Sequence, residues 1–279
     1  MATYESPTYE SSEGLVVELA DGVLRITLDR PAKRNALDDS MISALNDHLE
    51  RVNTDESVRA IWLTSNGDDF CSGFDLLARN EGGRNEPGTG RPRVGSMQRR
   101  VPAQAHRLIP LMLSTQVPIV CSTRGWVAGI GFHLGVAADF CVTARDARFW
   151  EPFTARGFTP DSGGTWLIPR LIGVARAKEL LLLGRELSGE EAAEWGLVHR
   201  AVDDADVDAT SAALVDRLAA GPTVALGLTK WLVHQGAGLD LERHLASEAL
   251  ALEVSARSDD FKEGIAALRE KRDPSFKGR

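Results

Sequence analysis

The chain of 279 residues contains few cysteines, no long apolar run and no excess of basic residues. Its three cysteines, Cys71, Cys121 and Cys141, lie in apolar segments without Cys-x-x-Cys spacing, which favours reduced, buried thiols over a disulfide framework or a zinc site. No apolar run approaches the about 20 residues of a membrane-spanning helix, and no secretory signal is visible. The net charge of -8 argues against nucleic acid or a membrane surface as the main partner. These absences predict a cytoplasmic globular protein without a metal site.

The chain does contain a regular alternation of strand-like and helical segments. Apolar and polar residues alternate on both sides of Asp21-Gly22, which predicts a β-hairpin. From Asp38, which suits an N-cap, apolar residues recur at helical spacing as far as Val52. Strand and helix patterns continue to about residue 204 and only helical patterns follow. The fold class is therefore α/β with a helical appendage.

The same patterns divide the chain into regions. We expect residues 1–13 to be a disordered lead-in, residues 14–204 to form the core and residues 205–279 to form a C-terminal helical region. Residues 80–97 are rich in Gly, Arg, Pro and Asn and lack periodicity, so they are expected to form a mobile loop beside the functional site. Residues 98–114 are expected to be helical.

The most informative segment runs from Val117 to Leu134. It begins as an apolar strand, turns at Gly125 and restarts as a helix near Gly129-Ile130-Gly131. Backbone N–H groups at a helix start have no intrahelical partner, so they can hold an oxygen that gains negative charge. The dinucleotide-binding fingerprint requires a third glycine where Leu134 stands, which argues against a nicotinamide cofactor.

Five segments carry a resemblance to a known family. They are residues 29–37, 70–76, 117–134 and 160–165, and the tail segment 260–264 together with 276–278. In this order and spacing the chain resembles the crotonase (enoyl-CoA hydratase/isomerase) superfamily from about Leu15 to Lys277. The resemblance implies a crotonase-type spiral of ββα units, with C-terminal helices that assemble homotrimers or dimers of trimers. It also implies an acyl-CoA thioester as substrate, an enolate intermediate and no cofactor.

The resemblance assigns residues to this chemistry. The thioester oxygen would be held by the backbone N–H groups of Phe74 and Ile130, so their side-chain identity matters little. Positive charge near the CoA phosphates would come from Lys33 and Arg34, and Lys262 or Lys277 would reach the CoA of a neighbouring subunit. The expected substrate- and CoA-binding residues are Lys33, Arg34, Ala36, Ser72, Gly73, Asp75, Leu76, Gly129, Phe153, Phe261 and Lys277.

The expected catalytic side chains depart from the hydratase pattern of two glutamates. His133 and Phe153 stand in the two glutamate positions, and water addition needs a base and an acid on the two sides of the water. Asp161, in Pro160-Asp161-Ser162-Gly163-Gly164-Thr165, is the predicted base, as in family isomerases; the alternative is a helix N-cap. His133 is a candidate second acid/base group or a structural histidine.

The favoured prediction is an enzyme that moves a double bond in an acyl-CoA, closest to the ring-1,2-epoxyphenylacetyl-CoA isomerase-like branch. Three alternatives stay open: an enoyl-CoA hydratase, a hydrolase like the aryl-CoA dehalogenases, and a non-catalytic acyl-CoA-binding protein. The dehalogenase alternative would use Asp161 as nucleophile with help from His106, which is otherwise expected to be an exposed helix residue. Glu151 is expected to be a solvated or structural carboxylate. The acyl group and the pathway are not predicted.

Overall fold

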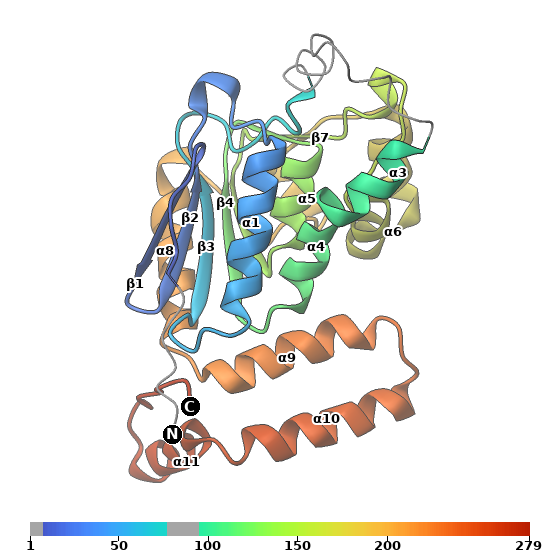
Figure 1. The fold of residues 1–279 in the computed structure, drawn as a ribbon. Coiled ribbons are helices and arrows are strands. Elements are labelled where there is room, and N and C mark those ends of the chain that lie inside the picture. Colours follow the sequence, from blue (N-terminus) through green and yellow to red (C-terminus); the bar gives the residue numbers. More distant parts are fainter. Residues whose placement is uncertain (1–7, 77–94) are drawn as a thin grey trace.

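The computed structural model describes residues 8–76 and 95–279 of the chain. A six-stranded sheet in the order β1-β2-β3-β4-β6-β9 forms its centre (Figure 1). Only β1 is antiparallel to its neighbour; the other neighbouring pairs are parallel. These strands are β1 (Leu15–Ala20), β2 (Val23–Leu28), β3 (Ala60–Ser65), β4 (Ile119–Thr123), β6 (Phe140–Ala144) and β9 (Arg200–Val202).

A second, three-stranded sheet lies beside the first, in the order β5-β7-β8. Its strands are β5 (Trp126–Ala128), β7 (Arg148–Trp150) and β8 (Leu187–Ser188). The chain passes repeatedly from a strand of one sheet to a strand of the other and then to a helix, as in β4, β5 and α5 (Ile130–Ala137). This arrangement agrees with the predicted α/β spiral of ββα units.

The predicted hairpin joins β1 and β2, with Ala20 paired to Val23. Asp21 and Gly22 between them have φ of 51° and 79°, the left-handed conformation that a tight two-residue hairpin turn requires. The predicted helix is α1 (Asp39–Val52), and the Asp38 side chain caps it by accepting the N–H of Met41 at 2.9 Å. Local sequence chemistry therefore determines both elements.

The predicted helix over residues 98–114 is interrupted. The structure has α3 (Ser96–Arg100), a 3-10 turn and then α4 (Ala105–Ser114). Pro102 explains the break, since proline has no N–H to donate and disfavours helical backbone at the residue before it. Most of the expected mobile loop, residues 80–94, lies outside the described residues.

The first described residues differ from the expected disordered lead-in. The Val17 N–H donates to Ser11 Oγ at 2.9 Å, and Arg51 donates to the Thr8 carbonyl at 2.6 Å. Residues 8–13 are thus held against β1 and α1, whereas residues 1–7 lie outside the described part of the chain.

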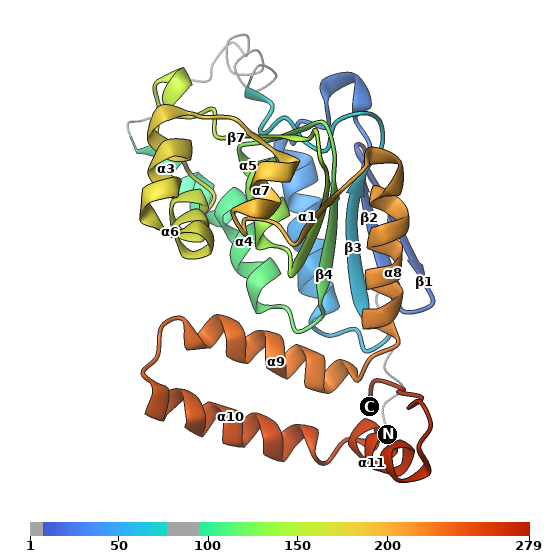
Figure 2. The ribbon, with the colours of Figure 1, turned by 180° about the vertical axis from the view of Figure 1, so that it is seen from behind.

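Helices cover both faces of the central sheet (Figures 1 and 2). α1 covers one face and contacts α4, and α8 (Val207–Ala219) covers the other face, against β3, β4 and β6. α8 thus belongs with the sheet, although it follows residue 204. On the α1 side, α5 contacts α4 and the long α6 (Gly164–Leu183), which has a kink at Gly173 where φ is 77°. α7 (Gly189–Glu194) begins with a capping box formed by Ser188 and Glu191.

The remaining helices lie at one end of the sheet (Figure 1). They are α9 (Thr223–Gly236), α10 (Leu241–Ser255) and α11 (Asp259–Glu270). Arg59, just before β3, donates to the carbonyls of Gly221 at 2.7 Å and Phe276 at 3.4 Å, which lie at the two ends of this helical region. Within residues 8–76 and 95–279, no helix combines the length and apolar character required to span a bilayer.

Candidate active site

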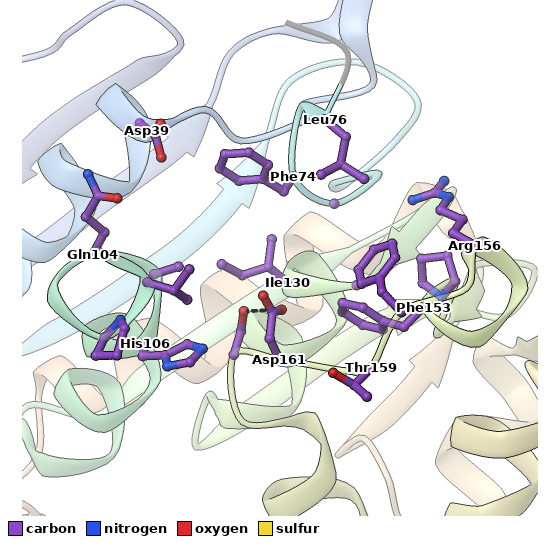
Figure 3. A pocket seen from close by; sticks show the side chains of 18 of the residues that line it. Asp39, Phe74, Leu76, Gln104, His106, Ile130, Phe153, Arg156, Thr159 and Asp161 are labelled. Atoms are coloured by element: carbon purple, nitrogen blue, oxygen red, sulfur yellow. Dashed lines mark hydrogen bonds between the residues drawn. The ribbon is translucent and has the colours of Figure 1, made fainter. Parts of the chain in front are cut away.

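A pocket of about 380 Å³ lies between the start of α5, the α3–α4 segment and the chain that precedes α6 (Figure 3). Its described lining comes from residues 73–76, 98–106, 129–130 and 152–162, and from Asp39 at the start of α1. Most of that lining is apolar, with few polar side chains turned inward. Such a pocket excludes water from most of a ligand and orients the ligand through a few polar groups.

Two backbone segments meet at this pocket. The Cys71 N–H donates to the Trp126 carbonyl at 2.9 Å, and the Ala128 N–H donates to the Cys71 carbonyl at 2.8 Å. A Cβ added to Gly129 would lie 3.8 Å from the Cα of Gly73, so the two glycines are neighbours. Both have the left-handed φ that favours glycine, 53° and 107°.

The predicted hydrogen-bond donors, Phe74 and Ile130, follow these two glycines directly and both line the pocket (Figure 3). Ile130 is the first residue of α5, where a backbone N–H has no acceptor within the helix. The helix dipole adds partial positive charge at the same point. The site therefore has a backbone arrangement that suits an oxygen carrying negative charge.

Asp161 lies beside Ile130, and its carboxylate turns into the pocket (Figure 3). It is not the N-cap of α6, because Gly163 holds that position and the helix start has no side-chain cap. Ser162 and Gly163 have φ of 56° and 92°, so the chain before the helix is not helical. The Ser162 hydroxyl donates to Asp161 Oδ1 at 2.9 Å. The N-cap alternative for Asp161 is wrong, and its side chain is available at the pocket.

The structure does not bring His133 into the pocket. Its imidazole is fully buried behind Phe153, and Nε2 lies 2.9 Å from Oε1 of Glu151, which is only 1 % exposed. Of the two expectations for Glu151, a solvated carboxylate is wrong, because this side chain is buried. Burial raises the pKa of Glu151; the neighbouring His133 opposes this shift and the charge of Asp161 adds to it. The two residues form a buried pair instead of an acid and a base facing substrate.

Phe153 forms the wall between that buried pair and the pocket. Its ring is parallel to the His133 imidazole, with an interplanar angle of 4° and 5.9 Å between centroids. The Phe158 ring meets it edge-on at 5.4 Å, and both rings line the pocket. A phenyl ring transfers no proton, so this wall contributes shape and exclusion of water.

Sequence reasoning used His106 only in the dehalogenase alternative and missed three other polar residues of the lining. His106, expected to be exposed, is half-buried on α4 and lines the pocket, and its buried Nε2 has no hydrogen-bond partner within the described part of the chain. Gln104, Arg156 and Thr159 also line the pocket (Figure 3). Pro102 was the signal in the sequence that could have indicated a break before α4, and with it a different direction for the His106 side chain.

Most of the predicted CoA-binding residues come together at one edge of the pocket. The Ser72 N–H donates to the Arg34 carbonyl at 2.9 Å and the Leu37 N–H to the Gly73 carbonyl at 2.9 Å, so residues 34–37 run beside residues 72–75. Ala36 belongs to the first of these segments, and Leu76 lines the pocket just beyond the second. The Lys33 ammonium lies 3.1 Å from Asp75 Oδ2 and is half exposed.

Phe261 and Lys277 are not brought to the pocket. Phe261 is on α11 and Lys277 is in the tail after it, at the other end of the molecule from α3 and α6 (Figure 1). Their predicted contact with CoA requires a neighbouring subunit. Over residues 8–76 and 95–279, no cluster of three or more His, Cys, Asp or Glu side chains is placed to hold a metal ion.

An apolar pocket beside a helix start, with a carboxylate turned into it, suits an enzyme whose ligand carries negative charge on an oxygen. The chain belongs to the enoyl-CoA hydratase/isomerase family, whose model matches residues 18–279. This membership confirms the predicted crotonase resemblance and identifies the protein as an enzyme of that family.

Individual relatives cover nearly the whole chain. The 1,2-epoxyphenylacetyl-CoA isomerase of Escherichia coli is 37% identical over 268 residues, which are 96% of this chain and 99% of the relative. The 4-chlorobenzoyl coenzyme A dehalogenase-1 of an Arthrobacter species is 31% identical over 94% of this chain and 92% of its own length. The crystal structure of an enoyl-CoA hydratase from Bacillus anthracis matches with a TM-score of 0.86 and 30% identity, over 95% of this chain and 100% of that one. The predicted crotonase-type fold is confirmed.

Proposed function

We propose that this enzyme moves a carbon–carbon double bond in an acyl-CoA thioester, with Asp161 as the single proton carrier. The observation that carries the proposal is the position of the Asp161 carboxylate, which faces the pocket beside Ile130 (Figure 3). The other carboxylate of the described lining, Asp39, belongs to α1 on the far side of the pocket (Figure 3).

In the proposed mechanism, Asp161 removes a proton from a carbon next to the conjugated system. The electron pair of the broken C–H bond moves into the thioester carbonyl, whose oxygen accepts hydrogen bonds from the N–H groups of Phe74 and Ile130. The protonated Asp161 then returns the proton two carbons away, and the double bond moves. No water is consumed and no electron carrier is needed. Each backbone donor of this kind contributes about 3–4 kcal/mol to the barrier reduction.

Hydration is the less favoured reaction. Phe153 occupies one of the positions at which a hydratase would place a glutamate, and His133 in the other position is sealed behind it. Syn addition of water requires both a base and an acid at the water. Neither of these two positions supplies an acid or base that faces the pocket, so proton return to carbon by Asp161 is favoured over water addition.

The CoA handle and the assembly form part of the same proposal. Lys33 and Arg34 lie at the exposed edge of the pocket and would attract the CoA phosphates.

Residues 14–204 would carry the chemistry, and the helical region would join copies into a homotrimer or a dimer of trimers, bringing Phe261 and Lys277 to the CoA of a neighbour. Exposed apolar side chains on α9, α10 and α11, such as Val233, Leu252 and Leu268, support this assembly. The three cysteines are unpaired, which suits the proposed cytoplasmic location.

The decisive experiment measures solvent-deuterium exchange into acyl-CoA substrates by the wild type and by Asp161→Asn. The variant should lose about 10²- to 10⁴-fold in exchange and isomerisation, the usual contribution of a positioned acid/base group. Its affinity for the CoA ester should change little. Asp39→Asn is the matched control and should lose far less. Retained turnover in Asp161→Asn would contradict the assignment.

One observation favours a second candidate, a hydrolase like the aryl-CoA dehalogenases. His106 lines the same pocket as Asp161, and its buried Nε2 lacks a hydrogen-bond partner within the described residues. In this alternative the Asp161 carboxylate adds to the ring carbon that bears the chlorine, and chloride leaves with the electron pair of the C–Cl bond. His106 then takes a proton from the water that hydrolyses the resulting ester on Asp161, which releases the hydroxylated product and the free carboxylate. Mass spectrometry of a single turnover with 4-chlorobenzoyl-CoA distinguishes the two, because only the hydrolase forms a covalent adduct on Asp161.

A further inference from the structure

The buried pair of His133 and Glu151 contacts both walls that flank Asp161 without reaching the pocket itself. The pair has 2.9 Å between Nε2 and Oε1, and both side chains are excluded from solvent. His133 Nδ1 and Glu151 Oε2 have no further hydrogen-bond partner in the described part of the chain. Buried polar atoms without partners are costly, so a pair that keeps them calls for a functional explanation.

One face of the imidazole supports the aromatic wall. Phe153 lies parallel to the ring, and Phe158 packs edge-on against Phe153. A rotation of the imidazole would remove the support from Phe153 and free both phenyl rings to shift from the positions that shape the pocket wall.

The same imidazole also fixes the start of α6. A Cβ added to Gly164 would overlap with His133 Nε2 and would lie 2.9 Å from Cε1, so the backbone of Gly164 packs directly against the ring. Gly164 is three residues after Asp161, and its N–H donates to the Asp161 carbonyl at 3.5 Å. The position of the Asp161 backbone is therefore coupled to the orientation of the imidazole, which Glu151 holds through Nε2, the ring atom nearest to Gly164.

We infer that His133 and Glu151 are positioning residues, which hold Phe153 and the Asp161 turn in the geometry that proton transfer requires. They contact neither substrate nor the reacting carbon. Since misplacing a reacting group by about 1 Å can cost on the order of 10²-fold in rate, loss of this support should act on kcat. The inference rests on the proposed function for the role of Asp161.

The test compares two substitutions of one residue. Glu151→Gln keeps a carbonyl oxygen that can accept the hydrogen bond of His133, whereas Glu151→Leu removes the acceptor at similar volume. We expect Glu151→Leu to lower kcat between about 10-fold and about 100-fold with little change in KM, and Glu151→Gln to retain most of the wild-type kcat. Equal losses in both variants, or no loss in either, would overturn the inference.

A second variant covers the case in which Glu151→Leu does not fold. Gly164→Ala pushes on the imidazole at Nε2 and disturbs its hydrogen bond while the Glu151 side chain stays intact, and it should reproduce the fall in kcat with KM unchanged. The proposed function fails separately, if Asp161→Asn retains exchange. If Asp161→Asn abolishes exchange but Gly164→Ala and Glu151→Leu keep the wild-type kcat, only the positioning inference fails.

Discussion

Two glycines of α5 allow a sharp test of the backbone donors. Gly131 and Gly135 are four residues apart on one helix and neither has a left-handed φ, so alanine suits the backbone at both positions. Their surroundings differ. A Cβ at Gly135 would meet Thr123 and Cys141 at 3.6 and 3.7 Å, which is ordinary contact.

At Gly131 an added Cβ would lie 2.5 Å from Cys71 Cβ and 2.8 Å from both the carbonyl oxygen and Sγ of Cys71. Two of these atoms cannot rotate away, because the Cys71 backbone is hydrogen-bonded to both ends of β5, at Trp126 and Ala128. Gly131→Ala must therefore separate α5 from the segment that leads to Phe74. Overpacking of this kind costs about 1–3 kcal/mol of stability.

The catalytic effect follows from the same displacement. Phe74 and Ile130 are the proposed donors to one oxygen, so moving their segments apart weakens at least one hydrogen bond. Complete loss of a donor corresponds to about 3–4 kcal/mol, or about 10²- to 10³-fold in kcat, which sets the upper limit for Gly131→Ala.

The assay is kcat and KM for isomerisation, with thermal unfolding of each variant. Gly135→Ala should keep kcat and gain up to about 1 kcal/mol in stability, because alanine is the better helix former. If Gly131→Ala retained a kcat within twofold of the wild type while folded, the two segments would not form the proposed oxyanion site.

Three further predictions concern stability. Burial lowers the pKa of His48, and the charge of Arg51 lowers it further, so the unfolded chain binds this proton at a higher pH than the folded chain. The free energy of unfolding therefore falls as the pH drops from about 6.5 through the folded pKa. His48→Gln should accordingly lose less Tm on acidification than the wild type. Lys230 is buried with its ammonium 2.8 Å from Asp139, so Lys230→Met should lower the free energy of unfolding in urea by about 3–5 kcal/mol. Adding Asp139→Asn should recover part of this loss, and no loss in Lys230→Met would mean that the pair contributes nothing to stability. Asp260 accepts the N–H groups of two tail residues at 2.6 and 2.8 Å, so Asp260→Ala should speed carboxypeptidase digestion with little change in the Tm of the sheet; an unchanged digestion rate would contradict this.

Features that depend on neighbouring residues could be predicted from the sequence. The hairpin turn at Asp21-Gly22 and the cap at Asp38 need only local chemistry, and both are present. The start of α5 at Ile130 is equally local, because glycines on either side of it produce the turn. The family resemblance supplied the position of Asp161, and the structure adds that this side chain does not cap α6.

Features that depend on packing could not be predicted. His133 and Glu151 are 18 residues apart, on a helix and after a strand, and each looked ordinary alone. Only the tertiary structure places one against the other and closes Phe153 over them. His106 likewise enters the pocket because α4 restarts after the Pro102 break, and helical periodicity across residues 98–114 gives no indication of the new direction.

Arg59 has a consequence for how this chain can vary. One guanidinium binds the chain where it leaves the α/β part, at Gly221, and where it returns, at Phe276. The two ends of the helical region between these points are thus held together at Arg59, whatever the length of the chain between them. Because Lys230 also ties α9 to the core at Asp139, changes of length that leave the sheet and the pocket in place fall beyond α9, in α10 and the turn that precedes it.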